Sequence, residues 1–310
     1  MDRLEAMSML VTVTEKGSLT AAAHALQVPL ATLSRKVSDL ETRLGARLLM
    51  RTTRKLTLTE AGIAYIAAAR RILEQVDEAE RAALGEFNLP RGELVVTAPV
   101  MFGRLHVLPV VIDFLAAHPD INIRLLLVDR NMDLVDDHVD MAIRIGHLPD
   151  SSLVATRIGT MRLVTCASPQ VLADHGTPKG PEELSRFPCV TVDILMPASV
   201  WRFNKPQAKA TIEVVVKSRL AVTTTEAAAQ AAIRNVGVTR LLHYQVADAA
   251  RRGELKLVLE AYEPDPAPVH LVHAARGQMP LKMRRFLDFA APRLKEAIAG
   301  IQSRKTRNPG

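Results

Sequence analysis

The sequence predicts an α/β protein of two parts: a small helical domain with a hairpin, and a larger domain of alternating strands and helices, joined by a long helix. Two observations predict this division. Over the first sixty residues apolar positions recur at helical spacing, whereas beyond Gly92 short apolar strands alternate with helices. A length of 310 residues and a hydrophobic content of 48% suit two domains with sizeable cores.

The first two helices are predicted from the spacing of their apolar residues and from their ends. The apolar positions of the first helix are Leu4, Met7 and Val11. Gly17 is a residue type at which helices end, and Ser18 stands in the N-cap position of the next helix. The apolar face of this second, alanine-rich helix is Leu19, Ala22, Ala23 and Leu26.

The third helix is predicted to run from about Leu30 to Leu44, between a turn at Gln27–Pro29 and Gly45. Its apolar face is Leu33, Val37, Leu40 and Leu44. The opposite face is Ala31, Arg35, Ser38 and Thr42, flanked by Thr32 and Ser34. Small and hydrogen-bonding side chains with one arginine suit a helix that lies in the major groove of DNA, and the arrangement is a helix-turn-helix.

A short basic hairpin follows the third helix. Leu56 and Leu58 alternate with threonines, as in a half-buried strand, and the polar stretch Arg51–Lys55 forms the predicted tip of a wing. The stretch from Arg35 to Lys55 contains seven Lys or Arg residues and two acidic residues, so its net charge is +5. Charge alone would favour a solvated helix face, but charge together with the helical pattern indicates contact with phosphate.

Several fragments in this order resemble the LysR-type family of transcriptional regulators. They are Ala21-Ala22-Ala23 with Leu26, Leu33-Ser34-Arg35 with Leu40-Glu41, Leu44-Gly45-Ala46-Arg47-Leu48-Leu49, Arg51-Thr52-Thr53-Arg54 and Leu58-Thr59-Glu60-Ala61-Gly62. Leu30-Ala31-Thr32 departs from the family's common Gln-Pro-Ala, so base contacts there must differ. The resemblance implies a bacterial, DNA-binding winged helix-turn-helix over residues 1–59. The predicted DNA contacts are Ser18, Thr20, Ala31, Thr32, Ser34, Arg35, Ser38, Arg51, Thr53, Arg54 and Lys55.

A long helix is predicted from Thr59, a suitable N-cap before Glu60, to Phe87. Apolar residues spaced alternately by three and four form a heptad seam with one polar breach at Glu80. The seam could pack on the chain's own C-terminal domain, but the resemblance favours a linker helix (residues 60–88) that pairs two chains. Such a dimer would hold two recognition helices about 34 Å apart over a palindrome. The predicted dimerisation residues are Ile66, Ala69, Leu73, Val76, Ala83 and Phe87.

The C-terminal part, residues 91–303, is predicted to form two α/β lobes with largely parallel sheets. The first lobe takes residues of about 92–150 and 269–300, and the second takes 151–268. The predicted elements of the first lobe are Glu93–Thr97, Arg104–Ala117, Asn122–Val128, a short helix at Asn131–His138, Met141–Ile145, Val269–Ala274 and a helix from Leu281 to about Ala299. Those of the second lobe are Arg162–Ala167, Ser168–His175, Glu213–Val216 and Glu226–Arg234.

Two such lobes resemble periplasmic-binding-protein domains, which is the build of the LysR family's effector domain. The ligand is then expected in the cleft between the lobes, where free backbone N–H groups after the first strand suit an anion. At Thr223 and Glu226 a simple capping box is an equally good interpretation. The predicted effector-binding residues are Ala98, Pro99, Val100, Met101, Phe102, Arg144, Gly146, Thr223, Thr224 and Thr225.

The sequence therefore predicts a DNA-binding transcription regulator that responds to a small, anionic effector. The alternatives are an α/β enzyme or a solute-binding protein with an accessory DNA-binding domain, but no catalytic motif, metal-ligand spacing or export signal is present. No cofactor or metal is expected, and Cys166 and Cys189 are expected to be reduced and buried. Further expectations are a cytoplasmic location with no membrane span, a homodimer that assembles into tetramers, and RNA polymerase as a partner.

Overall fold

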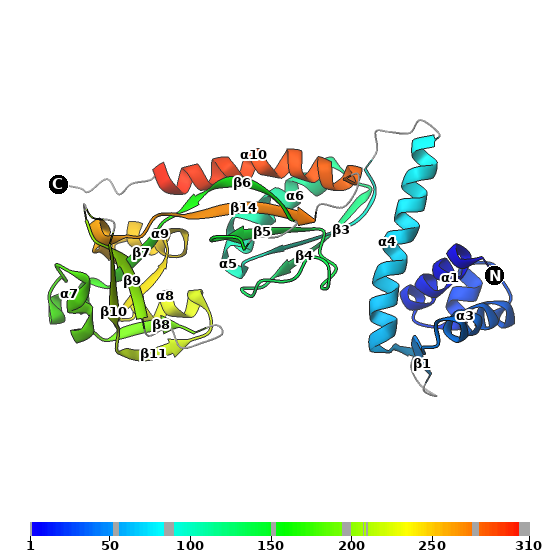
Figure 1. Ribbon diagram of the computed structural model, residues 1–310, viewed down its shortest axis with the longest axis horizontal. Helices are drawn as coiled ribbons and strands as arrows, with labels where there is room; N and C mark the ends of the chain where they lie inside the picture. The colour runs from blue at the N-terminus through cyan, green and yellow to red at the C-terminus, as the bar shows by residue number, and fades with distance from the viewer. Residues whose placement is uncertain are drawn as a thin grey trace. The chain divides into compact units, whose positions relative to one another are not determined.

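The computed structural model divides into two compact units, Met1–Leu89 and Pro90–Gly310, each of which is considered by itself (Figure 1). The residues that the structure describes are 2–51, 56–83, 90–149, 153–193, 200–206, 208, 210–274 and 279–303.

The N-terminal unit contains three short helices, a two-stranded hairpin and one long helix. In chain order these are α1 (Arg3–Lys16), α2 (Leu19–Ala25), α3 (Leu30–Leu44), β1 (Leu49–Arg51), β2 (Leu56–Leu58) and α4 (Glu60–Ala83). Helices α1 and α3 end at left-handed glycines, Gly17 and Gly45, with φ of 68° and 65°. The Ser18 hydroxyl caps α2 by accepting from the Ala21 N–H at 3.0 Å. The predicted helix-turn-helix with a wing is therefore confirmed.

The core of this unit corrects two details of the sequence analysis. Helix α1 buries Ala6, Met9, Leu10 and Val13, whereas Leu4 is 37% exposed. Two apolar stripes of helical spacing adjoin on α1, and packing against the neighbouring helices selects the second one. Leu44 is 42% exposed because it lies in the last turn of α3, beyond the buried Leu33, Val37 and Leu40.

Helix α4 packs against α1 along its N-terminal half, which corrects the predicted dimerisation seam at two positions. Ile66 and Ala69 are buried in the chain's own N-terminal unit, with exposures of only 6% and 1%. The large apolar side chains that α4 exposes are instead Ile63, at 60%, and Ile72, at 39%. The side chain of Ala83 and all of Phe87 lie outside the described residues.

The first sheet of the C-terminal unit has the strand order β4-β3-β5-β14-β6. Strand β3 pairs in parallel with β4 and β5, and β14 pairs antiparallel with β5 and β6. The strands are β3 (Gly92–Ala98), β4 (Ile121–Leu127), β5 (Met141–Ile145), β6 (Leu153–Met161) and β14 (Ala267–Ala274). The main core lies between this sheet and α5 (Val100–Phe102), a short π-helix η1 (Gly103–Val107), α6 (Leu108–Ala117) and α10 (Leu281–Ser303).

The helical stretch Val100–Ala117 is long and apolar enough to cross a membrane by length and composition alone. It is nevertheless a core helix of this unit, because Phe102, Val107 and Phe114 are buried against the first sheet and α10.

The second sheet has the order β11-β8-β12-β7-β13, again with both parallel and antiparallel pairs. Its strands are β7 (Leu163–Ala167), β8 (Cys189–Val192), β11 (Ser218–Val222), β12 (Val238–Leu242) and β13 (Lys256–Val258). The other elements are α7 (Pro169–His175), η2 (Pro181–Arg186), α8 (Thr225–Ile233), α9 (His243–Arg251), η3 (Glu260–Tyr262) and the hairpin of β9 (Val200–Asn204) with β10 (Thr211–Val215).

Three predictions about the C-terminal unit were wrong in detail. Strand β6 lies in the first sheet, so the second lobe begins after Met161 rather than near residue 151. Both sheets are mixed rather than largely parallel: β14 pairs antiparallel with β5 and β6 in the first sheet, and β7 pairs antiparallel with β12 and β13 in the second. The segment 131–138 forms turns instead of a helix, since the Asp133 carboxylate accepts from the Val135 and Asp136 N–H groups and competes with helical bonding.

The two cysteines are free thiols buried in the second lobe, as the sequence predicts. Burial raises the pKa of each thiol, Cys166 and Cys189, to about 12. Because a thiolate is the reactive species, these residues serve as small apolar core residues.

Candidate functional site

The outer face of α3 is a ridge of four exposed residues, Ala31, Arg35, Ser38 and Thr42. Thr32 and Ser34 beside the ridge are half-buried. The ridge is held outward because the opposite face, Leu33, Val37 and Leu40, is buried in the core of the unit. Its small side chains leave the helix backbone accessible to a groove.

Cationic side chains on and beside the ridge differ in whether they are neutralised. Lys36 forms an ion pair with Glu5 of α1, so the charge of Lys36 is neutralised within the unit. Arg35, Arg43 and Arg47 are exposed and form no ion pair with the described residues. Unpaired, exposed guanidinium groups on α3 and just after it make this part of the unit an attractive site for phosphate.

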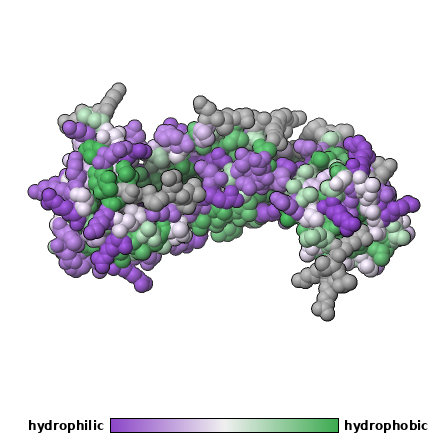
Figure 2. Space-filling view, turned by 60° about the horizontal axis from the view of Figure 1, so that its bottom comes forward, coloured by the Kyte–Doolittle hydropathy of each residue, from purple (hydrophilic) through white to green (hydrophobic). Residues whose placement is uncertain are grey.

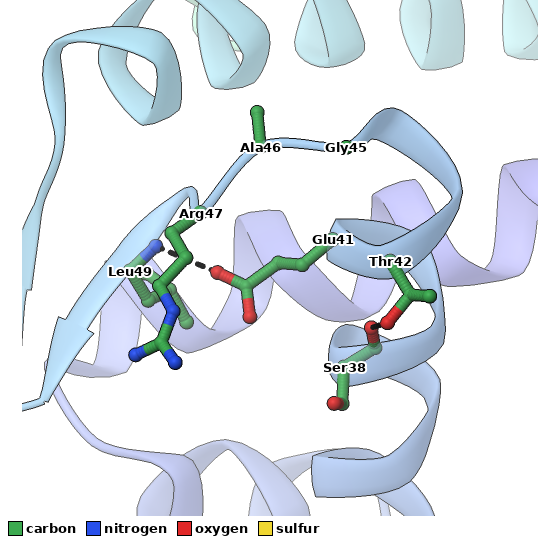
Figure 3. A pocket seen from close by; sticks show the side chains of 7 residues that line it. All are labelled: Ser38, Glu41, Thr42, Gly45, Ala46, Arg47 and Leu49. Atoms are coloured by element: carbon green, nitrogen blue, oxygen red, sulfur yellow. Dashed lines mark hydrogen bonds between the residues drawn. The ribbon is translucent and has the colours of Figure 1, made fainter.

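Glu41 fixes the start of the hairpin to α3. Its Oε1 accepts from the Leu48 N–H at 2.7 Å. It also accepts from the Leu49 N–H at 3.0 Å (Figure 3). The Thr59 hydroxyl donates to the Arg47 carbonyl at 2.7 Å and accepts from the Gly62 N–H, so it also caps α4. Side chains from both flanking helices therefore position β1.

An open pocket of about 420 Å³ lies where α3 meets β1. Figure 3 shows Glu41 and Arg47 on one side of it and Ser38 and Thr42 on the other. The Thr42 hydroxyl donates to the Ser38 carbonyl, so it serves the helix backbone first. Because the ridge runs into this pocket, Arg47 adds a cation to one end of the ridge.

The remaining predicted DNA contacts lie at the start of α2 and in the wing. Ser18 is half-buried, and its hydroxyl accepts a hydrogen bond that caps α2. Thr20 is exposed in the first turn of the same helix. Thr53, Arg54, Lys55 and the side chain of Arg51 lie outside the described residues.

In the C-terminal unit the turn between β3 and α5 places only part of the predicted effector site at the surface. Val100 is 38% exposed, and its N–H donates to Asp129 Oδ1 at 3.0 Å. Ala98 and Phe102 are buried, so their side chains do not lie at this surface, and their contact with a ligand stays a prediction. Phe102 packs instead against His106 and Tyr244, and burial raises the pKa of the Tyr244 hydroxyl.

Pro99 and Met101 are half-buried, and Met101 packs against the main core. Since the Asp129 carboxylate already occupies the Val100 N–H, this turn is less suited to an anion than the sequence predicts. The Arg144 guanidinium on the neighbouring strand β5 donates to the Met132 carbonyl and has no ion pair with the described residues. Gly146 follows β5 with a φ of 120°, and a Cβ there would meet nothing within 4 Å.

The second predicted segment of the site begins α8. Thr224 is the N-cap, and its hydroxyl accepts from the Ala227 N–H at 3.3 Å, so the cap lies one residue later than the predicted Thr223. Thr223 is exposed and Thr225 half-buried. Glu226 of α8 forms an ion pair with Arg104 of η1 at 3.2 Å, which links the two lobes.

Comparisons with known proteins cover both units of the chain. Residues 4–63 match a model of the bacterial regulatory helix-turn-helix proteins of the LysR family, and residues 87–295 match a model of the LysR substrate-binding domain. The chain belongs to the LysR family. It is a transcription regulator rather than an enzyme, with a helix-turn-helix that binds DNA and a domain that binds a small-molecule effector.

Individual relatives are similar over most of their length. An HTH-type transcriptional repressor of Pseudomonas aeruginosa is 33% identical over 93% of this chain and 91% of its own. The HTH-type transcriptional activator AaeR of Escherichia coli is 30% identical over 92% of this chain and 91% of its own length. The solved structure of CrgA from Neisseria meningitidis is 30% identical, covers 94% of this chain and 98% of its own, and superposes with a TM-score of 0.59.

A second solved structure, the virulence activator AphB of Vibrio cholerae, is 27% identical over 94% of this chain and 99% of its own, with a TM-score of 0.59.

Two residues beside the ridge, Glu41 and Arg47, were not among the predicted DNA contacts, although Arg47 belongs to the basic stretch between Arg35 and Lys55. Glu41 and Arg47 both lie in the fragments that carry the family resemblance, but neither is on the outer face of a helix. Glu41 accepts from the Leu48 N–H because the chain folds back past α3 seven residues later. Helical spacing cannot indicate such a contact.

Proposed function

We propose that the regulator reads DNA through the ridge on α3, with Arg35 at a base edge and Ala31 and Ser38 in contact with the groove. The observation that carries this proposal is that the whole ridge is exposed and that its arginine, Arg35, forms no ion pair with the described residues. An arginine that contacts a guanine through two hydrogen bonds is the commonest specific contact in the major groove. Thr32 and Ser34 flank the ridge and complete the reading surface.

The proposed phosphate contacts surround this reading surface. Thr20 in the first turn of α2 and the basic wing, residues 51–55, would fix the register of the unit on the duplex. Ser18 contributes by ordering the start of α2 through its cap.

Selection of duplexes from a random pool by the full-length protein tests this proposal. We expect enrichment of one palindromic sequence, with affinity for it that falls steeply as salt rises. Recovery of unenriched sequences, or enrichment that survives Arg35→Ala unchanged, would contradict base reading by α3.

We propose that two chains pair through the exposed face of α4. Ile63 and Ile72 are the exposed large apolar residues of this helix, and the half-buried Leu73 and Val76 adjoin them. Replacement of both isoleucines with lysine is expected to shift sedimentation toward the monomer at micromolar concentration. Ala64→Lys on the exposed part of the same helix is the control, and an unchanged dimer in the double variant would contradict this face. Assembly of dimers into tetramers is a further part of the proposal.

We propose a small anionic effector bound beside β5, at Arg144 and Gly146. An unpaired arginine next to an open glycine supports this position better than the β3–α5 turn, where Asp129 occupies the exposed N–H. Pro99, Val100, Met101 and Thr223–Thr225 would line the approach. The proposal also includes a cytoplasmic location and contact of DNA-bound regulator with RNA polymerase, as expected of a transcription regulator.

A further inference from the structure

Three basic side chains lie in one row across the first sheet. His270 of β14 is directly opposite Arg144 of β5 on one side and directly opposite Arg157 of β6 on the other. Residues directly opposite each other in antiparallel strands project from the same face, with Cβ atoms about 5 Å apart. The three strands run side by side in Figure 1, so the row spans the middle and one edge of the sheet.

The row lies on the face of the sheet away from the main core. Val269, Leu271 and Ile158, the neighbours of these residues along β14 and β6, are buried in the core with α6 and α10. Because side chains alternate along a strand, His270 and Arg157 project from the other face. Arg157 is exposed and Arg144 and His270 are half-buried, so the row is reachable from solvent.

The surroundings of the row leave room for a ligand. In the adjacent row on the same face, Ala142 and Val272 are buried in a cluster with Leu134 and Val139, whereas Ala155 is exposed, so the accessible part of this face lies along β6. Gly146, two residues after Arg144, has open space where a Cβ would be. Thr97 of β3 is paired with Ala142, so the turn after β3 comes beside Arg144.

The charges of the row are not balanced. Neither Arg144 nor Arg157 forms an ion pair with the residues that the structure describes. His270 Nδ1 is buried and has no hydrogen-bond partner among them. Burial lowers the pKa of His270, and the positive charges of Arg157 and His147 lower it further. A group of cations with an unfilled hydrogen-bonding atom between them is the arrangement that an oxyanion would complete.

We propose that Arg144, His270 and Arg157 form a binding site for the carboxylate or phosphate group of a small molecule. This inference rests on the proposed effector function and extends it, because it assigns ligand contacts to Arg157 and His270. The two arginines donate from either side, and His270 donates through its imidazole. The organic part of the ligand would extend over Gly146 toward the β3–α5 turn.

Calorimetric titration of the full-length protein with inorganic phosphate and with acetate, at fixed ionic strength, tests the site. We expect saturable binding of at least one probe by the wild type, and a loss of about tenfold or more in Arg157→Gln. Arg157→Lys should recover part of the affinity. Arg219→Gln removes an exposed, unpaired arginine from β11 in the second lobe and should bind as the wild type does.

Two outcomes would overturn the proposal: no binding of either probe at tens of millimolar, or wild-type affinity in Arg157→Gln. The preference between phosphate and acetate identifies the oxyanion. DNA affinity without any probe is measured in the same samples and should be unchanged in Arg157→Gln. If the wild type bound no duplex, the proposed function would fail regardless of the titration, so the two failures are distinguishable.

Discussion

The two basic surfaces of this regulator are built in different ways. On α3 the ridge around Arg35 belongs to one helix, and its exposure follows from the burial of the opposite face of the same helix. In the first sheet Arg144, His270 and Arg157 come from three strands, and the order β5-β14-β6 alone brings them together. The helical surface therefore depends on local packing, whereas the row of the sheet depends on strand register.

The greatest loss of stability is expected where Gly62 of α4 approaches the backbone of Leu48, next to the surface formed by α3. A Cβ at Gly62 would lie 2.0 Å from the Leu48 carbonyl oxygen, so Gly62→Ala forces β1 away from α4. We expect a loss of about 3 kcal/mol of unfolding free energy and a loss of DNA binding. Gly300→Ala in α10 is the control, because nothing lies within 4 Å of a Cβ there, and thermal or urea unfolding compares the two. Equal stability of both variants would contradict a tight junction at Leu48.

The next effect tests whether one carboxylate positions the hairpin. Glu41→Ala leaves the partly buried N–H groups of Leu48 and Leu49 without their acceptor. We expect destabilisation by about 2 kcal/mol, with a weaker affinity for DNA that Glu41→Gln partly restores. Glu60→Gln at the exposed start of α4 should change stability far less. If Glu41→Ala unfolded at the same urea concentration as the wild type, the anchoring role would be wrong.

A third pair of variants separates base reading from phosphate contact within the helical surface. Arg35→Ala should cost about 1–3 kcal/mol for the selected sequence and much less for random duplex. Arg47→Ala should weaken both equally and reduce the log–log salt slope by about 0.9. Fluorescence anisotropy over a range of salt concentrations measures both quantities. An equal loss on both duplexes in Arg35→Ala would assign that residue to phosphate.

The smallest loss of stability is expected from removing one helix cap in each unit. Ser18→Ala and Thr224→Ala each remove a hydroxyl that accepts one backbone N–H at the start of a helix. Each should cost about 1 kcal/mol of unfolding free energy. Only Ser18→Ala should also weaken DNA binding, since α2 precedes the recognition helix. A loss of DNA affinity in Thr224→Ala would show that the cap in the second lobe acts on the DNA-binding unit.

Features set by neighbouring residues were predictable from sequence, and features set by distant ones were not. The N-cap Ser18, the helix end at Gly45 and the exposed face of α3 each follow from a few adjacent positions. The stripe of α1 that is buried and the burial of Ile66 depend on which helix packs against which.

The C-terminal unit shows the same division. Strands β3 and β5 were predictable from short apolar runs, but the place of β6 in the first sheet was not, because its partner β14 follows more than one hundred residues later. The predicted Arg144 could therefore not be joined to His270 and Arg157 before the register was known. The Asp129 cap on Val100 was missed for the same reason.

Charge reversal at the centre of the ridge tests whether the exposed face of α3 is the surface that binds DNA. The affinity of full-length Arg35→Glu for the selected duplex should fall by about tenfold or more, since a favourable contact becomes a repulsive one. Arg219→Glu, an equal change of charge on β11, should bind as the wild type does. Equal affinities of the two variants, or no binding of any duplex by the wild type at low salt, would contradict the claim.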